Sequence, residues 1–195
     1  MKYISLTIIL FLISCSSSDK VDPNTQTAAQ SKFVKTTDSL NTRNFPVSIG
    51  MTQQQIRELF PISEFKKKDA WSYGVDGGGY GIEVLLNESV LFFFWLHWET
   101  ELVDGIVLVS PDYHIDENVH VGMSFSRFIE KYPKTKSFIG LLTSREGCYI
   151  EDKNYWITLD SKDGSWAAKY SFENGESEFI EYVDLDKRID EIMIH

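Results

Sequence analysis

The chain has 195 residues, of which 43% are hydrophobic and 25% are charged. This is an ordinary globular composition, and it excludes a collagen-like or wholly disordered chain. Asp and Glu number 29 against 19 Lys and Arg, so the net charge is -10. This balance argues against a nucleic-acid-binding surface, because phosphate contacts need clustered Lys and Arg. The two cysteines are too few for a disulfide framework.

The first residues have the pattern of a secretory signal. Lys2 is followed by an uninterrupted, mostly apolar run over residues 3–13. A helix of that length spans roughly 16 Å, whereas the hydrocarbon core of a bilayer needs about 30 Å. We therefore predict a signal peptide over residues 1–14 and not a membrane-spanning helix.

The end of this run resembles the bacterial lipoprotein signal, with Leu12 three positions before Cys15 and the small residue Ser14 directly before it. The resemblance implies that Cys15 becomes the first mature residue and carries diacylglyceryl and acyl groups, which together anchor a protein stably to a membrane. The alternative is an ordinary secretory signal that happens to contain a cysteine. Ser16, by resemblance to enterobacterial sorting, favours the outer membrane. We expect a lipid-anchored protein of the bacterial cell envelope, on its periplasmic or its surface side.

Residues 15–46 are rich in Ser, Thr, Asn, Gln, Lys and Asp and contain few large apolar side chains. Such a segment cannot bury enough surface to offset the entropy of ordering it, so it is interpreted as a disordered tether. A first strand near Phe33 and Val34 is the alternative.

Residues 49–61 and 121–133 repeat one another at an offset of 72 residues, with Gly, Met, Glu and Pro at matching positions. Thr52 and Ser124 are good N-cap residues, and Gln55 can complete a capping box with Thr52. A proline ends each segment, so we expect one short amphipathic helix in each.

Runs rich in β-branched and aromatic residues follow each helix and are separated by Gly-containing breaks, which is typical of strands and turns. The expected strands cover residues 71–75, 81–86, 90–98, 101–109, 148–151, 154–159, 166–172, 178–183 and 187–194. The last run also fits a helical stripe, but residues 188–194 resemble 102–108, and this favours a strand. That match is 86 residues apart, so the second copy carries about 14 extra residues before its last strand.

The duplicated Gly-Met-Thr/Ser helix start followed by strands resembles the β-lactamase inhibitor protein, and a single copy of the unit resembles the small lipoprotein subunit of the outer-membrane β-barrel assembly machine. The resemblance implies an α+β fold of two tandem units, residues 47–118 and 119–195. Each unit is expected to pack a short N-terminal helix on an antiparallel β-meander, and the two meanders can join into one larger curved sheet. The segment after each helix lacks the Gly-x-Pro of many family members, and no inhibitory contact residue can be assigned. A solvated sheet face would be available to a partner.

Four aromatic side chains are candidates for partner binding: Trp71, Tyr73, Trp166 and Tyr170. Trp71 and Tyr73 share one face of an extended chain, and so do Trp166 and Tyr170. Aromatic residues are favoured at binding hot spots, but the alternative is that these four fill the core.

The stretch from 110 to 120 contains weak candidates for metal ligands, namely Asp112, His114, Asp116 and His120. It lies between the predicted units without a recognised ligand spacing, so solvated loop residues are the preferred interpretation. No cofactor is expected. Gly77–Gly81 lacks the following Lys and is interpreted as a hairpin turn. Cys148 is expected to be buried and inert.

No catalytic constellation, such as Gly-x-Ser-x-Gly, is recognisable in the sequence. The leading hypothesis is a non-enzymatic, lipid-anchored module, inhibitor-like in its narrower form, that binds another envelope protein. A small-ligand-binding or metal-binding lipoprotein is the alternative, and a hydrolytic enzyme is third. The membrane is expected to be contacted through Cys15 alone, since residues 47–195 carry a net charge of -12 and anionic lipids would repel them.

Overall fold

A computed structural model describes residues 42–195 except 77–78, 141–142, 162–163 and 174–175. The predicted signal peptide, Cys15, the possible strand near Phe33 and most of the predicted tether lie outside the described residues. The described elements all belong to one compact unit, Thr36–His195. None of the helices in the described part of the chain is long and apolar enough to cross a membrane.

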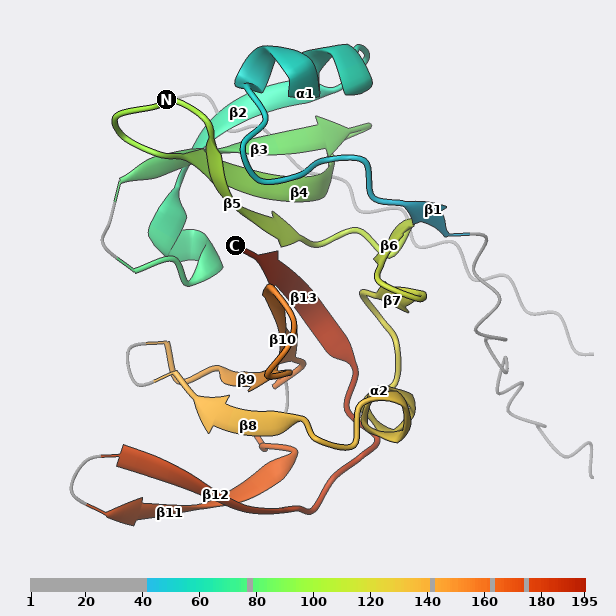
Figure 1. The fold of residues 1–195 in the computed structure, drawn as a ribbon, viewed down its shortest axis with the longest axis vertical. Coiled ribbons are helices and arrows are strands. Elements are labelled where there is room, and N and C mark those ends of the chain that lie inside the picture. Colours follow the sequence, from blue (N-terminus) through green and yellow to red (C-terminus); the bar gives the residue numbers. More distant parts are fainter. Residues whose placement is uncertain (1–41, 77–78, 141–142, 162–163, 174–175) are drawn as a thin grey trace, which may run out of the picture. The chain divides into compact units, whose positions relative to one another are not determined.

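The described residues form thirteen strands, two α-helices and one 3-10 helix, η1 (Figure 1). In chain order they are β1 (Arg43–Asn44), α1 (Gln53–Leu59), β2 (Glu64–Asp69), η1 (Ala70–Tyr73), β3 (Tyr80–Leu86), β4 (Ser89–Leu96), β5 (Val103–Leu108), β6 (Tyr113–Ile115), β7 (Val119–His120), α2 (Phe125–Lys131), β8 (Lys136–Ile139), β9 (Glu146–Tyr149), β10 (Tyr155–Leu159), β11 (Ala168–Glu173), β12 (Glu176–Tyr182) and β13 (Ile189–Ile194).

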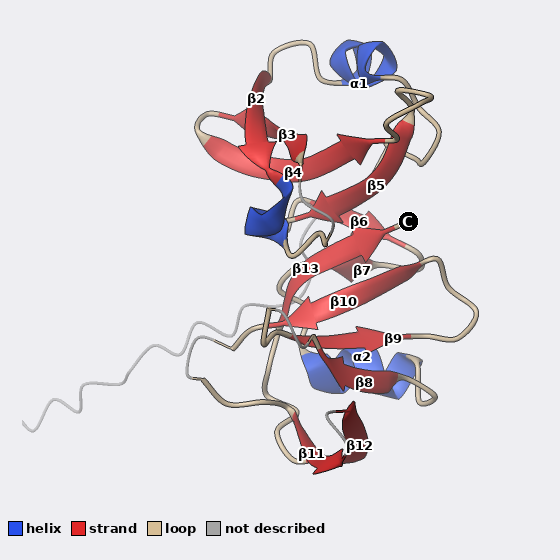
Figure 2. Ribbon diagram, turned by 90° about the vertical axis from the view of Figure 1, so that its left-hand side faces the viewer, coloured by secondary structure: helices blue, strands red, loops and turns tan. Residues whose placement is uncertain are grey.

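The predicted α+β fold of two helix-on-meander units is wrong, because the described chain is mostly β and its main strands form one eight-stranded sheet (Figure 2). The strand order of this sheet is β2-β3-β4-β5-β13-β10-β9-β8. β5 and β13 pair antiparallel at its centre, with Ile106 opposite Ile194. In two separate sheets, β5 and β13 would be edge strands with unpaired backbone N–H and C=O groups, and their pairing gives these groups hydrogen-bond partners. The two α-helices have only seven residues each.

The two helix starts predicted from the repeat are confirmed, and both are attached to the central strands in the same way. Gly50 donates its backbone N–H to Val103 at 2.8 Å, and Gly122 donates its own to Ile189 at 2.7 Å. Both glycines have a φ of 85°, a conformation that other residues adopt only with strain. The repeated Gly therefore provides the turn by which each helix start joins β5 or β13.

The two N-caps differ in one respect. The Thr52 hydroxyl accepts a hydrogen bond from the Gln55 backbone N–H at 3.2 Å, and the Gln55 side chain accepts from the Thr52 N–H at 2.8 Å. This is the predicted capping box. Ser124 occupies the equivalent position, but its hydroxyl caps no backbone N–H of its helix and accepts only from the Ser126 hydroxyl, at 3.3 Å.

Replacing Thr52 with alanine is therefore expected to lower the free energy of unfolding by about 1 kcal/mol. Ser124→Ala is the matched control and should change it by less than about 0.5 kcal/mol. Urea unfolding followed by circular dichroism measures both values. Equal losses in the two variants would contradict the assignment of a working cap to Thr52 alone.

The strand expected over residues 71–75 is also wrong, because η1 occupies most of this run. The Asp69 side chain accepts a hydrogen bond from the Trp71 N–H at 2.9 Å, and Gly74 ends the turn in a left-handed conformation. A side-chain cap and a glycine stop outweigh the β-propensity of the aromatic residues between them. The sequence also failed to predict β2, a charged strand at one edge of the sheet, and β8, a short strand at the other.

The helices pack on one face of the sheet, here called the core face. One row of cross-strand partners crosses all eight strands on this face: Phe65, Val84, Phe92, Leu108, Ile192, Ile157, Cys148 and Ser137. Ile56 of α1 and Phe125 and Phe128 of α2 are fully buried in the same hydrophobic cluster. Cys148 is buried as expected, and this burial raises the pKa of its thiol to about 12, which disfavours the reactive thiolate.

Candidate functional site

The opposite face of the sheet, here called the outer face, carries a second row of cross-strand partners. From edge to edge it reads Lys66, Glu83, Phe93, Val107, Met193, Trp156, Tyr149 and Lys136. Cross-strand partners point to the same side of a sheet, so the row is continuous. Its middle is apolar and aromatic, and both of its ends are charged.

Glycines let two aromatic rings lie flat on this face. Gly105 is the partner of Trp95, and Gly147 is the partner of Phe138. A methyl group on either glycine would overlap the opposing ring. Since neither glycine has a positive φ, the reason for glycine here is space and not backbone conformation.

The segment around η1 covers the middle of the outer face. Tyr73 stacks on Phe93 with ring centroids 4.3 Å apart and an angle of 13° between the ring planes. Its hydroxyl donates a hydrogen bond to Glu83 Oε1 at 2.7 Å. Burial is the main cause that raises the pKa of the Tyr73 hydroxyl far above its usual value, and the hydrogen-bonded Glu83 carboxylate raises it further. Tyr73 therefore remains a neutral donor.

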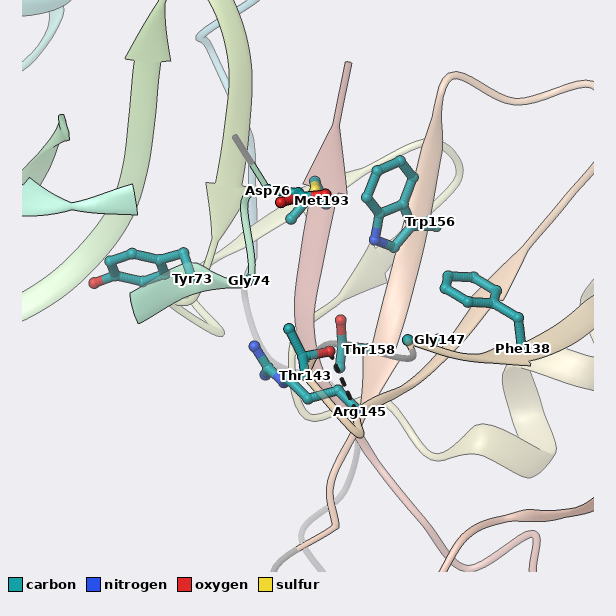
Figure 3. Close-up of a pocket in the computed structure, with 11 residues that line it drawn as sticks. Tyr73, Gly74, Asp76, Phe138, Thr143, Arg145, Gly147, Trp156, Thr158 and Met193 are labelled. Carbon is teal, nitrogen blue, oxygen red and sulfur yellow. Dashed lines mark hydrogen bonds between the residues drawn. The ribbon is translucent and has the colours of Figure 1, made fainter. Parts of the chain in front are cut away.

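Beside this cover lies an open pocket of about 380 Å³ (Figure 3). Trp156 and Thr158 of β10, Phe138 of β8 and Met193 of β13 contribute its side chains from the sheet, and Gly74 follows η1 at its other side. The remaining lining residues are Tyr73, Asp76, Gly140, Thr143, Arg145 and Gly147. The pocket volume lies within the range of about 300–1,000 Å³ that is typical of ligand sites.

Among the described residues that line the pocket, Arg145 is the one basic residue, and two acidic side chains hold its guanidinium group. Its Nη1 donates to Glu191 Oε2 at 2.7 Å, and its Nη2 lies 3.4 Å from Asp190 Oδ2. Burial raises the pKa of Glu191, and the Arg145 guanidinium offsets only part of that rise. The charge on Arg145 is thus already balanced by protein groups.

The four aromatic candidates from the sequence lie in two places in the structure, Trp71 with Tyr73 on η1 and Trp166 with Tyr170 at the start of the β11–β12 hairpin. Trp71 is 49% exposed, on η1, whereas the Tyr73 side chain beside it is buried. Trp166 is half-buried, and its ring lies 5.7 Å from that of the buried Tyr170. The structure does not bring Trp71 and Trp166 together in the pocket. Phe138 and Trp156, which the sequence did not single out, line it instead.

The four weak metal candidates lie on or beside the β6–β7 hairpin. His114 and His120 are cross-strand partners, but the His114 ring contacts the Thr42 hydroxyl at 2.8 Å and the His120 ring contacts the Val121 carbonyl at 2.9 Å. Among the described residues, no group of three or more His, Cys, Asp or Glu side chains is placed to hold a metal ion.

Asp116 instead forms a polar cluster with two tyrosines and a lysine. Its Oδ2 lies 2.6 Å from Lys153 Nζ and accepts from the hydroxyls of Tyr132 at 3.0 Å and Tyr155 at 3.3 Å. Burial alone would raise the pKa of Asp116, but the hydrogen bonds from Lys153 and Tyr132 outweigh it and bring the pKa below its ordinary value of 3.8. The carboxylate holds the turn between β6 and β7.

Because this pKa is lowered in the folded state, the charged form of Asp116 stabilises the fold above the ordinary pKa, and that contribution is lost as the pH falls through the folded-state value. Asp116→Asn should therefore be less stable than the wild type near neutral pH, and the difference should shrink at acidic pH. Urea unfolding over a pH series measures this. A difference that does not depend on pH would contradict the electrostatic role.

The buried residue that the sequence did not reveal is Glu146 of β9, which is 1% exposed. Its Oε2 accepts from the Ala167 N–H at 2.6 Å, and its Oε1 accepts from the Ala168 N–H at 2.9 Å and from the Tyr170 hydroxyl at 2.7 Å. This side chain fastens the β11–β12 hairpin to the eight-stranded sheet. The signal in the sequence was the single acidic residue of the Glu-Gly-Cys-Tyr strand.

No family model and no curated protein matches the chain. Among solved structures, the chain is similar to the crystal structure of the uncharacterized protein YfeY from Escherichia coli. The match has a TM-score of 0.45 and 12% sequence identity, and it covers 79% of this chain and 99% of the other. A likeness at this level carries no argument about fold or function.

Proposed function

We propose that this chain is a non-enzymatic, lipid-anchored protein of the bacterial cell envelope that binds a partner protein through the outer face of its sheet. The observation that carries the proposal is the open pocket on that face, next to the end of the row that η1 leaves uncovered, where Trp156 is half-buried and Tyr149 is exposed. Aromatic anchors around a pocket are the usual centre of a protein interface. The lipid anchor is inferred from the sequence around Cys15.

The pocket suits an apolar side chain of a partner better than an anionic group. Its sheet-side wall is formed largely by Phe138, Trp156 and Met193, and its one basic residue is already balanced by Glu191 and Asp190. An anionic ligand would find no uncompensated charge on Arg145 and would lose its hydration. An apolar side chain would lose only its exposure to water, which favours binding.

The test is site-specific photocrosslinking in intact cells of the bacterium that produces the protein. A photoreactive amino acid at Tyr149, which is exposed beside Trp156, should give a discrete protein adduct. The control is the same amino acid at Trp98, an exposed residue outside the pocket lining. The proposal fails if position 149 gives no adduct, or the same adducts as position 98.

A narrower form of the proposal is inhibition of a hydrolase, as the resemblance to the β-lactamase inhibitor protein suggests. The chain from Ser16 onward, assayed against a panel of β-lactamases, tests this form. Absence of inhibition would remove the narrower form and leave the binding proposal in place.

The size of the pocket also favours a second candidate, a small apolar ligand. Thermal-shift screening of metabolites against the same chain distinguishes it. Stabilisation that Trp156→Ala abolishes, without any protein adduct at position 149, would favour the small ligand.

A further inference from the structure

The β11–β12 hairpin is an addition to the framework of the protein. In the first half of the sheet, the chain passes from β4 to the neighbouring β5 through the short segment 97–102. At the corresponding place in the second half, between β10 and β13, it makes the hairpin instead. β11 and β12 pair only with each other and do not extend the eight-stranded sheet (Figure 1). The sheet does not need this hairpin in order to close.

The hairpin is nevertheless held firmly in place. Glu146 accepts three hydrogen bonds from its residues, and the Tyr182 hydroxyl donates to the Thr135 carbonyl at 3.1 Å. The rings of Trp166 and Phe172 lie 5.9 Å apart, and those of Phe179 and Tyr182 lie 4.7 Å apart. An added element fixed by a buried polar group is pre-organised, so binding to it costs little ordering entropy.

This fixed element and the segment after it expose large apolar side chains. Ile180 is 49% exposed, Val183 61% and Leu185 40%. Phe172 is 56% exposed but lies on the other face of the hairpin, beside Tyr170. Scattered exposed apolar residues need no explanation, but several on one hairpin and its continuation are typical of an interaction surface.

The same segment holds much of the acidity of the protein. Residues 166–186 contain six acidic residues and a single basic one, Lys169. Among the acidic side chains, those of Glu178, Glu181 and Asp186 are exposed. Acidic groups around apolar ones repel anionic lipid and nucleic acid and attract a cationic partner.

We propose that the face of β12 that carries Glu178, Ile180 and Glu181, with its continuation to Asp186, is a second docking surface, for a protein segment that combines Lys or Arg with an aromatic or aliphatic side chain. This surface goes beyond the proposed outer-face function, because none of the residues lining the pocket belongs to 166–186. A protein with two such surfaces connects two partners.

The test uses a random peptide library displayed on phage and the chain from Ser16 onward as the target. Enriched peptides are expected to carry Lys or Arg beside apolar residues, and a synthetic copy should bind less tightly as salt is raised. Glu178→Lys with Glu181→Lys should weaken binding of that peptide by about tenfold or more, as should Ile180→Ser with Val183→Ser. Trp156→Ala, in the pocket, should leave the affinity unchanged.

The matched control for the charge reversal is Glu99→Lys with Glu151→Lys, which changes the net charge equally at exposed sites outside the hairpin. Circular dichroism and thermal unfolding confirm that each variant is folded. The proposal is overturned by any of three results: no basic–apolar enrichment, equal weakening by the control pair, or flotation of the chain with phosphatidylcholine vesicles that depends on Ile180.

Discussion

Replacing Glu146 with alanine is expected to lower the free energy of unfolding by about 3 to 5 kcal/mol, because two buried backbone N–H groups and a tyrosine hydroxyl lose their acceptor. The hairpin should lose its protection from hydrogen exchange first, because Ala167 and Ala168 attach it to Glu146. Urea unfolding gives the total loss, and hydrogen exchange of these two amides gives its location.

Two variants sharpen this test. Glu146→Gln keeps the shape of the side chain but turns one acceptor oxygen into an amide donor facing another donor, so it should also be destabilised, by less than the alanine variant. Glu178→Ala, an exposed position on the same hairpin, should stay within about 0.5 kcal/mol of the wild type. Uniformly faster exchange across the whole sheet in Glu146→Ala would contradict the role of a local fastener.

Phe92→Ala is expected to cost about 3 to 5 kcal/mol, through lost apolar burial and the cavity that remains. Phe92 is fully buried on the core face, and its ring lies 5.1 Å from those of both Phe45 and Phe60. It therefore joins the segment after β1 and the end of α1 to the sheet. Thermal and urea unfolding measure the effect.

Trp98→Ala is the control for this substitution, because it removes a larger aromatic side chain that is exposed. It should change stability by less than about 0.5 kcal/mol. Comparable losses in Phe92→Ala and Trp98→Ala would show that the core-face cluster does not dominate the stability of the fold.

Local features of the fold could be predicted from the sequence, whereas its pairing could not. The helix starts after Met51 and Met123 depend on caps and prolines within each short segment, and the strand over residues 90–98 depends on its own run of aromatic and β-branched residues. The pairing of β5 with β13 depends on residues more than eighty positions apart, and a run of apolar residues does not specify its partner. That single pairing joins the strands of both expected units in one eight-stranded sheet, which is why the α+β fold of two helix-on-meander units was wrong.

The candidate site was less predictable for the same reason. Phe138, Trp156 and Met193 come from three strands, and only the sheet order brings them to one pocket. Tyr73 and Tyr170 have the residue type of a binding anchor, but each is buried with its hydroxyl on a glutamate that is distant in sequence. Aromatic residues serve cores and interfaces equally well, so composition alone cannot separate the two uses.

The central position of β13 has a consequence for biosynthesis. Residues 189–194 lie between β5 and β10, so the two halves of the sheet cannot join until these residues have left the ribosome. Until then, the edges of β5 and β10 are open to pairing with other chains. We expect the last step of folding to be slow, because contacts that are distant in sequence dominate it.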